Sequence, residues 1–280
     1  MNALVTGGTD GIGKEIARGL ARRGARVLIA GHDARKGALA QRELQREAAG
    51  EAVEFLQADL TLMRETERLA AEVSARVDAL HCLVLSAGMV RGRRVLTSEG
   101  IESNFALGYL SRFVLVRRLA ERIGCAAAPG ILIVNGAARN GKIHYDDLNL
   151  THNFGTLRAV FQLCEANDVL VLELARRFPG VTVLGLKVGV VRTNIRSQFP
   201  LWMKVIVPAL VDPLLAVTPE QVAEAALHLL TSTAFAGASG ELFQFIKRFK
   251  PVRPGSSTSD TGNGRRLWDV SSALWERALA

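Results

Sequence analysis

The sequence predicts a doubly wound α/β domain, in which a parallel sheet of about seven strands carries helices on both faces. Short apolar runs alternate with longer helical patterns along the 280 residues, and this alternation is typical of parallel strands joined by helices. The apolar runs are continuous, as expected for strands that are buried on both faces. A glycine-rich segment joins the first run to the first helical pattern. Together these observations indicate an open sheet with a ligand site at the carboxyl ends of its strands.

The expected strands and helices alternate over most of the chain. We expect strands at residues 3–6, 27–30, 53–57, 82–85, 131–135, 182–186 and 241–245. We expect helices at residues 11–23, 34–49, 62–77, 100–123, 157–178 and 219–230. Hydrophobic residues make up 49% of the chain, which is enough for a large core. We therefore expect residues 1–280 to form a single domain.

Three segments in the C-terminal part depart from this alternation. Residues 194–217 are apolar and follow the carboxyl end of a predicted strand. We expect them to form a helical lid over a ligand pocket, because open α/β sheets bind ligands at that edge; a helix packed into the core is the alternative. Residues 255–264 are small and polar and predict a surface loop. Residues 265–278 carry Trp268 and Trp275 at helical spacing, which predicts a docked terminal helix.

The composition of the chain indicates which kinds of molecule it binds. The formal net charge is +8, but no basic run with interleaved aromatic residues occurs, so we expect a phosphate-rich cofactor or an acidic small molecule rather than nucleic acid. The three cysteines lack the spacing of a metal or disulfide site. The apolar stretch 201–217 holds Lys204, Asp212 and two prolines, which makes it a poor membrane span. The first strand begins close to Met1, so we expect no signal peptide and a cytoplasmic protein; the sequence leaves a homo-oligomer open.

The most informative motif is the glycine-rich segment at residues 6–13. It reads Thr-Gly-Gly-Thr-Asp-Gly-Ile-Gly and lies between a predicted strand and a predicted helix. Glycine allows a tight turn and close approach of the backbone to a pyrophosphate, and the helix N-terminus supplies free N–H groups. The strand–turn–helix context distinguishes the motif from an ordinary glycine-rich turn. We therefore expect a dinucleotide, held by Gly7, Thr9, Asp10, Gly11, Ile12 and Gly13.

The residues after the second strand indicate which dinucleotide binds. A carboxylate at this strand end usually binds the ribose hydroxyls of NAD, but here the first carboxylate is Asp33, which follows His32. Arg35 and Lys36 come next and would tolerate a 2′-phosphate. We therefore expect NADP(H), bound in part by His32 and Arg35, with NAD(H) as the alternative. Lys36 is equally well explained as a solvent-exposed charge at the start of a helix.

The T-G-x-x-x-G-x-G spacing of residues 6–13 is similar to that of the short-chain dehydrogenase/reductase family, which has a Rossmann-type fold. Further landmarks occur in the family's order over nearly the whole chain. They are Asp59-Leu60, Leu85-Ser86-Ala87-Gly88, Ser103-Asn104, Glu173-Leu-Ala-Arg-Arg, Lys187-Val-Gly189-Val190-Val-Arg-Thr193 and Leu267-Trp-Asp-Val. The fourth and the last resemble the retinol-dehydrogenase-like branch in particular. The resemblance implies that the cofactor also contacts Asp59, Leu60, Ala87, Gly88, Val190 and Thr193.

The catalytic positions depart from the family's pattern. The family places a serine after the fifth strand and Y-x-x-x-K on the next helix, where this chain has Ala138, Val160 and Cys164. Neither tyrosine of the chain is followed by a lysine four residues later. Of the usual tetrad only Asn104 remains, and it is the one residue to which the resemblance implies a catalytic role. We expect Cys164 to be a small buried side chain.

Loss of these groups removes the usual proton donor but leaves hydride transfer, which the cofactor carries out. A substrate whose carbonyl is hydrogen-bonded to its own neighbouring hydroxyl would bring the missing proton. Alternative donors are Asn104, His144, Tyr145 and Cys164. We favour the substrate, because the replacements leave an apolar floor that suits a flat polycyclic ligand. The residues expected to bind it are Ala138, Val160, Phe199, Trp202 and Met203.

The combination resembles the atypical angucyclinone ketoreductases of antibiotic biosynthesis, the class found in simocyclinone biosynthesis. The resemblance implies an NADPH-dependent ketoreductase that acts on a polycyclic aromatic polyketide. A catalytically inactive NADP-binding sensor or scaffold is the alternative. The apolar lid favours the enzyme, because a sensor has less use for a second, ligand-sized cavity.

Overall fold

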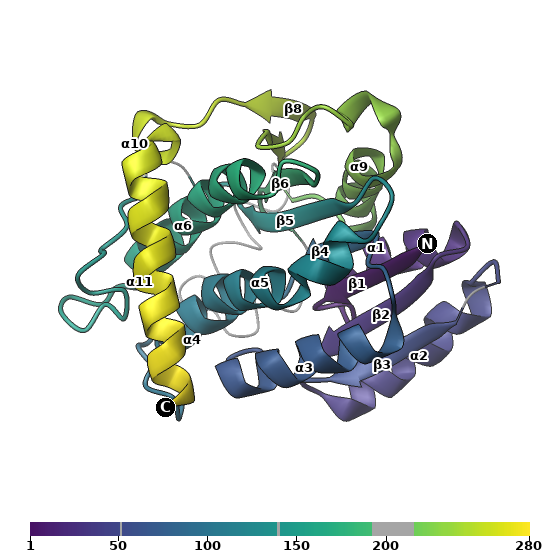
Figure 1. Cartoon of the computed structure of the whole chain (residues 1–280), viewed down its shortest axis with the longest axis horizontal. Helices are drawn as coiled ribbons and strands as arrows, with labels where there is room; N and C mark the ends of the chain where they lie inside the picture. Colours follow the sequence, from purple (N-terminus) through teal and green to yellow (C-terminus); the bar gives the residue numbers. More distant parts are fainter. Residues whose placement is uncertain (51, 139–140, 192–215) are drawn as a thin grey trace.

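The computed structural model describes residues 1–50, 52–138, 141–191 and 216–280. Within these residues an eight-stranded sheet has the order β3-β2-β1-β4-β5-β6-β7-β8 (Figure 1). The strands are β1 (Asn2–Thr6), β2 (Arg26–Gly31), β3 (Val53–Gln57), β4 (Cys82–Leu85), β5 (Gly130–Gly136), β6 (Thr182–Val188), β7 (Leu242–Phe245) and β8 (Phe249–Val252). The order changes direction between β1 and β4, which confirms the doubly wound fold and puts its ligand-binding switch point at the carboxyl ends of these two strands.

Helices cover both faces of the sheet (Figure 1). One face carries α1 (Gly11–Arg22), α2 (Ala34–Glu47) and α9 (Pro219–Thr231). The other carries α3 (Met63–Arg76), α4 (Ser103–Phe105), a π-helical turn (Ala106–Leu110), α5 (Ser111–Gly124), α6 (Thr156–Arg177), α10 (Ser256–Ser259) and α11 (Thr261–Leu279). Within β1, Ala3 and Val5 pack toward α1 whereas Leu4 packs toward α5. Because successive side chains of a strand point to opposite faces, burial on both sides explains the continuous apolar runs.

Strand β8 is absent from the sequence prediction. It pairs antiparallel with β7 at the edge of an otherwise parallel sheet. Its lysine and proline obscure the strand pattern, and proline is tolerated at an edge because no neighbour needs its missing N–H. The ring of Phe249 stacks on Phe243 with centroids 5.2 Å apart, so an aromatic contact holds the edge strand in place.

The prediction of a surface loop at residues 255–264 is wrong. This segment contains α10 and the first turn of α11. Asp260 begins α11 by accepting a hydrogen bond from the backbone N–H of Gly262 at 2.7 Å, as an N-cap does. Thr258 is buried and donates to Glu165 of α6 at 2.6 Å. Local capping and this tertiary contact therefore order residues whose composition alone suggests a loop.

The docked terminal helix is confirmed, although it is longer than the expected 265–278. Helix α11 lies beside α6 and α3 (Figure 1). Trp275 is 7% exposed, and the rings of Trp268 and Phe113 meet edge to face at 4.9 Å. The two tryptophans therefore pack α11 against the side of the core that α5 and α6 form.

Two other expectations need adjustment. The helix expected from residue 100 begins at Ser103, because Glu102 caps it by accepting hydrogen bonds from the backbone N–H groups of Asn104 and Phe105. The lid predicted at residues 194–217 lies outside the described residues except for its last two positions, where Val217 bridges to Val191. Among the helices that the structure describes, none combines the length and the apolar character needed to cross a bilayer.

Candidate cofactor cleft and catalytic positions

The turn between β1 and α1 has the backbone geometry that a phosphate site needs. Gly7 and Gly11 have φ angles of +69° and +52°, in the left-handed region that favours glycine. A Cβ on Gly13 would lie 2.4 Å from the carbonyl oxygen of Gly7, so glycine lets α1 start close against the end of β1. This brings the N-terminus of α1, whose first N–H groups have no partner within the helix, to the switch point of the sheet.

A cleft of about 400 Å³ opens at this switch point. Most of the residues expected to contact the cofactor line it: Gly7, Thr9, Asp10, Gly11, Ile12, Gly13, His32, Asp59, Leu60, Ala87 and Gly88. Lining residues that the sequence analysis did not assign include Asp33, Lys36, Ser86, Met89, Arg91 and Leu107. Arg35 and Val190 are not among the lining residues, and Thr193 lies outside the described part of the chain.

The rim after β2 bears on cofactor choice. The carboxylate of Asp33 accepts hydrogen bonds from the backbone N–H groups of Arg35 at 2.9 Å and Lys36 at 3.0 Å. The bond from Lys36 leads the effects that lower the pKa of Asp33. This carboxylate therefore serves as the N-cap of α2. The ammonium of Lys36 lies 3.9 Å from Asp10 at the cleft rim, whereas Arg35 is exposed and is not among the residues that line the cleft.

The positions of the family's catalytic set carry no ionisable oxygen or amine. Ala138 follows β5, and Val160 and Cys164 lie on α6. Cys164 is 3% exposed, and burial raises the pKa of its thiol to about 11, so the thiol stays neutral at neutral pH. The expectation of a small buried side chain is confirmed. The proposed lid residues Phe199, Trp202 and Met203 lie outside the described residues.

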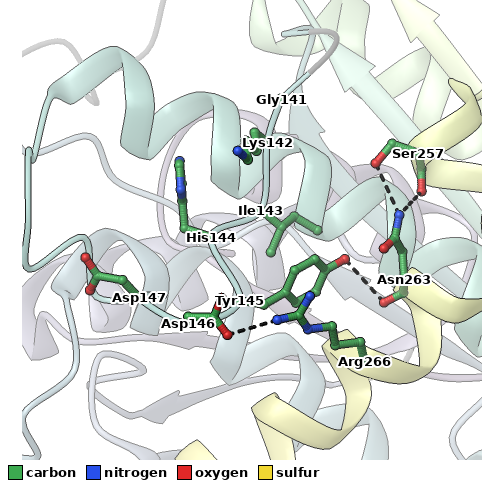
Figure 2. A pocket seen from close by; sticks show the side chains of 10 residues that line it. All are labelled: Gly141, Lys142, Ile143, His144, Tyr145, Asp146, Asp147, Ser257, Asn263 and Arg266. Atoms are coloured by element: carbon green, nitrogen blue, oxygen red, sulfur yellow. Dashed lines mark hydrogen bonds and ion pairs between the residues drawn. The ribbon is translucent and has the colours of Figure 1, made fainter.

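Both tyrosines of the chain are engaged away from the cleft. The hydroxyl of Tyr109 is fully buried and hydrogen-bonded to Ser271 at 2.9 Å. The hydroxyl of Tyr145 donates to the carbonyl of Asn263 at 3.3 Å. Tyr145 lines a second pocket, whose volume is about 440 Å³. Figure 2 shows this pocket between the loop at residues 141–147 and the segment that carries α10 and α11. His144 lines the same pocket, so neither of these alternative donors lines the cofactor cleft.

Asn104 is buried, and its side-chain amide is hydrogen-bonded to other residues of the chain. Its amide oxygen accepts a hydrogen bond from the backbone N–H of Arg91 at 2.7 Å. Its amide nitrogen donates to Glu102 at 2.9 Å. Asn104 therefore holds the loop that follows β4, and this loop contributes Met89 and Arg91 to the cleft.

Two buried cations lie near Cys164, and no sequence motif indicates a role for either. Lys187 of β6 is 2% exposed and pairs with Asp168 of α6. Arg112 of α5 is 5% exposed; its guanidinium donates to Asn167 and to the carbonyl of Ala87, each at 3.0 Å. Each of these residues lies within an apolar run of the sequence, and a charge in such a run could have indicated a buried cation. Among the described residues, no cluster of His, Cys, Asp and Glu could hold a metal ion.

The family model for short chain dehydrogenases matches residues 1–204. The chain belongs to the short-chain dehydrogenase family. Retinol dehydrogenase 12 of Bos taurus is 32% identical over 286 residues, which cover 98% of this chain and 87% of that relative. This short-chain dehydrogenase is accordingly an oxidoreductase that depends on a nicotinamide dinucleotide.

Solved structures share the fold of this short-chain dehydrogenase. A protein from Mycobacterium paratuberculosis matches with a TM-score of 0.77 at 24% identity and covers 98% of this chain and 93% of its own. The Pseudomonas aeruginosa RhlG/NADP complex matches with a TM-score of 0.70 at 23% identity, over 88% and 94% of the two chains. These similarities confirm the Rossmann-type α/β fold.

Proposed function

We propose that this short-chain dehydrogenase reduces a ketone on a polycyclic aromatic polyketide of angucyclinone type, in antibiotic biosynthesis, and that the substrate supplies the proton. One observation carries the proposal: the position expected for the catalytic tyrosine holds Val160, and both tyrosines are hydrogen-bonded outside the cleft. A reaction that needs no protein acid is consistent with this arrangement. The sequence resemblance to the angucyclinone ketoreductases supports the substrate class.

The cofactor proposed is NADP(H). The glycine turn fits a dinucleotide, because a Cβ at Gly13 would occupy the backbone of the turn. One carboxylate oxygen of Asp33 accepts from the N-terminus of its own helix, which leaves only the other oxygen for the ribose hydroxyls of NAD(H). Lys36 lines the cleft and would interact favourably with a 2′-phosphate. These features support a preference for NADPH over NADH.

The chemistry divides between cofactor, substrate and protein. When bound, the reduced nicotinamide supplies a hydride to the carbonyl carbon. The carbonyl oxygen then takes the proton of the substrate's neighbouring hydroxyl, which leaves a phenolate that regains a proton from water. The protein holds the ketone in place, and such positioning contributes strongly to rate on its own. Asn104 acts as a positioning residue through the loop that follows β4.

Paired substrates test this proposal. We expect NADPH absorbance to fall in the presence of a peri-hydroxy polycyclic ketone and to remain nearly constant with its methyl ether. The ether keeps the ring system and the ketone but has no proton to donate, and a positioned donor is typically worth about 10²–10⁴-fold in rate. Equal rates for the two compounds would contradict substrate-assisted protonation.

A variant supplies the complementary control. Val160→Tyr is expected to leave the rate with the hydroxy ketone unchanged or lower, because the substrate already donates the proton. A large gain in rate would show that the missing protein acid limits the native reaction. Tight NADPH binding with no turnover of any ketone would favour the inactive sensor or scaffold. The proposal further places the enzyme in the cytoplasm, with a small-molecule partner, and as a monomer or a homo-oligomer.

A further inference from the structure

Arg112 is a buried charge that has no counterion among the residues the structure describes. Its side chain lies 5% exposed on α5. One guanidinium nitrogen donates to the amide oxygen of Asn167, and another donates to the carbonyl oxygen of Ala87. Its Nε has no hydrogen-bond partner among the described residues. No carboxylate within the described chain pairs with it, and Cys164 is the one titratable neighbour that acts on it.

Such a charge lowers the stability of a fold unless something compensates it. Transfer of a cation out of water without a counterion is unfavourable, because nearby charge no longer offsets its lost hydration. The surrounding helix residues Phe113, Val114 and Leu115 are fully buried and apolar, so a leucine would suit the packing at position 112. Burial lowers the pKa of Arg112 to about 10, and the side chain therefore remains charged at neutral pH. An uncompensated buried charge next to a cleft is a candidate for a functional role.

The position of Arg112 connects it to the cofactor cleft. Ala87, whose carbonyl accepts its hydrogen bond, lines the cleft together with Leu107 and Met89. The π-helical turn Ala106–Leu110 directly precedes α5, and such turns are frequent at functional sites. The guanidinium thus lies directly behind one wall of the cleft.

The other buried cation near this wall is already compensated. Lys187 pairs with Asp168, which also accepts a hydrogen bond from Asn135 at 3.4 Å. Position 164, where the family resemblance expects a lysine, carries a neutral thiol. Among these groups, Arg112 is therefore the one source of net positive charge.

We propose that Arg112 supplies from α5 the positive charge that position 164 of α6 lacks, and that it stabilises negative charge on a substrate oxygen at the end of the cleft formed by Ala87, Met89 and Leu107. The inference rests on the proposed function. Reduction of a hydroxyaryl ketone with its own proton leaves a phenolate, and a fixed cation behind the wall would stabilise that anion without donating a proton to it. The substrate class is accordingly an aryl ketone whose neighbouring hydroxyl can ionise.

The test measures the charge effect directly. A peri-hydroxyanthraquinone changes colour when its phenol ionises, so its pKa can be titrated by absorbance while bound to the protein with NADP⁺. In the wild-type complex we expect this pKa to lie below that of the free phenol. In Arg112→Gln, which retains hydrogen-bonding groups and removes the charge, we expect it to rise by about one unit, as estimated for a charge several ångströms away in a protein environment.

Three comparisons separate this role from a structural one. Arg112→Lys keeps the charge and should keep most of the shift. Arg117 lies on the exposed side of the same helix, over the ring of Trp275. The control variant Arg117→Met also removes one positive charge from this helix and should leave the phenol pKa unchanged. Arg112→Met removes the charge and both hydrogen bonds, so it should lower the reduction rate about tenfold or more, whereas Arg112→Lys should retain most of that rate.

Each outcome bears on one proposal. An unchanged phenol pKa in folded Arg112→Gln, or a wild-type complex that binds the probe without a shift or does not bind it, overturns the role of Arg112. A wild-type protein that lowers the phenol pKa but oxidises no NADPH with any ketone contradicts the proposed reduction and leaves the electrostatic role standing.

Discussion

Lys187 at the end of β6 and Asp168 on α6 form a buried ion pair beside Cys164. Burial raises the pKa of Asp168 to about 6 from its ordinary 3.8, while the charge of Lys187 acts to lower it. Because the folded-state pKa is above the unfolded value, ionisation of this carboxyl lowers stability as the pH rises from 3.8 to about 6. The pair therefore joins β6 to α6. Ionisation of Asp168 lowers the stability of the fold, and the nearby ammonium of Lys187 makes this loss smaller.

Lys187→Met tests this relationship through the pH dependence of stability. Without the ammonium the pKa of Asp168 should rise further, so the loss of stability should continue to higher pH. We expect the variant to be more destabilised at about pH 8 than at about pH 5, by about 1–3 kcal/mol, measured by urea denaturation. The double variant with Asp168→Asn should lose this pH dependence, and a pH-independent effect of Lys187→Met would contradict the assignment.

Gly13→Ala tests the phosphate turn. The added Cβ would meet the carbonyl of Gly7 at 2.4 Å, so the turn must shift. We expect a loss of about 1–3 kcal/mol in stability and about tenfold or greater weakening of NADPH binding, measured by fluorescence titration. Gly124→Ala is the matched control, since its added Cβ would meet no described atom within 4 Å outside its chain neighbours and its own helix backbone, and it should be neutral or slightly stabilising. Equal effects of both changes would argue against a special role for the turn.

Lys36→Glu tests the cofactor preference. Lys36 lines the cleft, whereas its neighbour Arg35 does not. We expect Lys36→Glu to weaken NADPH binding about tenfold and to change NADH binding little, because only NADPH carries the 2′-phosphate. Arg35→Glu makes the same change in net charge and should have a smaller effect. If the two variants behave alike, long-range charge rather than a contact at Lys36 determines the preference.

The reactivity of the three cysteines tests whether the thiol of Cys164 is neutral in the folded protein. Burial raises the pKa of Cys82 to about 12 and that of Cys164 to about 11, and the thiolate is the reactive form. Cys125 is exposed. We expect iodoacetamide near pH 8 to modify Cys125 alone in the native protein and all three cysteines in denaturant, as read by peptide mass spectrometry. Native labelling of Cys164 as fast as Cys125 would reveal a reactive thiol and reopen its role as a proton donor.

The sequence by itself determined the doubly wound fold, the glycine turn and most of the cofactor cleft. These features depend on contiguous residues and on the order of strands and helices. Gly7 to Gly13 form one local turn, and the switch point of the sheet brings it next to Ala87. The sequence likewise shows that the serine, tyrosine and lysine of the family's catalytic set are replaced, because the residues at the aligned positions can be read directly from it.

Only the tertiary structure decided where the buried charges and the tyrosine hydroxyls lie. Arg112 and Ala87 are 25 residues apart, and Tyr145 and Asn263 are 118 apart. Helical periodicity indicates which face of a helix is buried, but it does not indicate which distant element that face meets. The same reason explains residues 255–264, whose polar composition suggests a loop until the contact of Thr258 with Glu165 orders them.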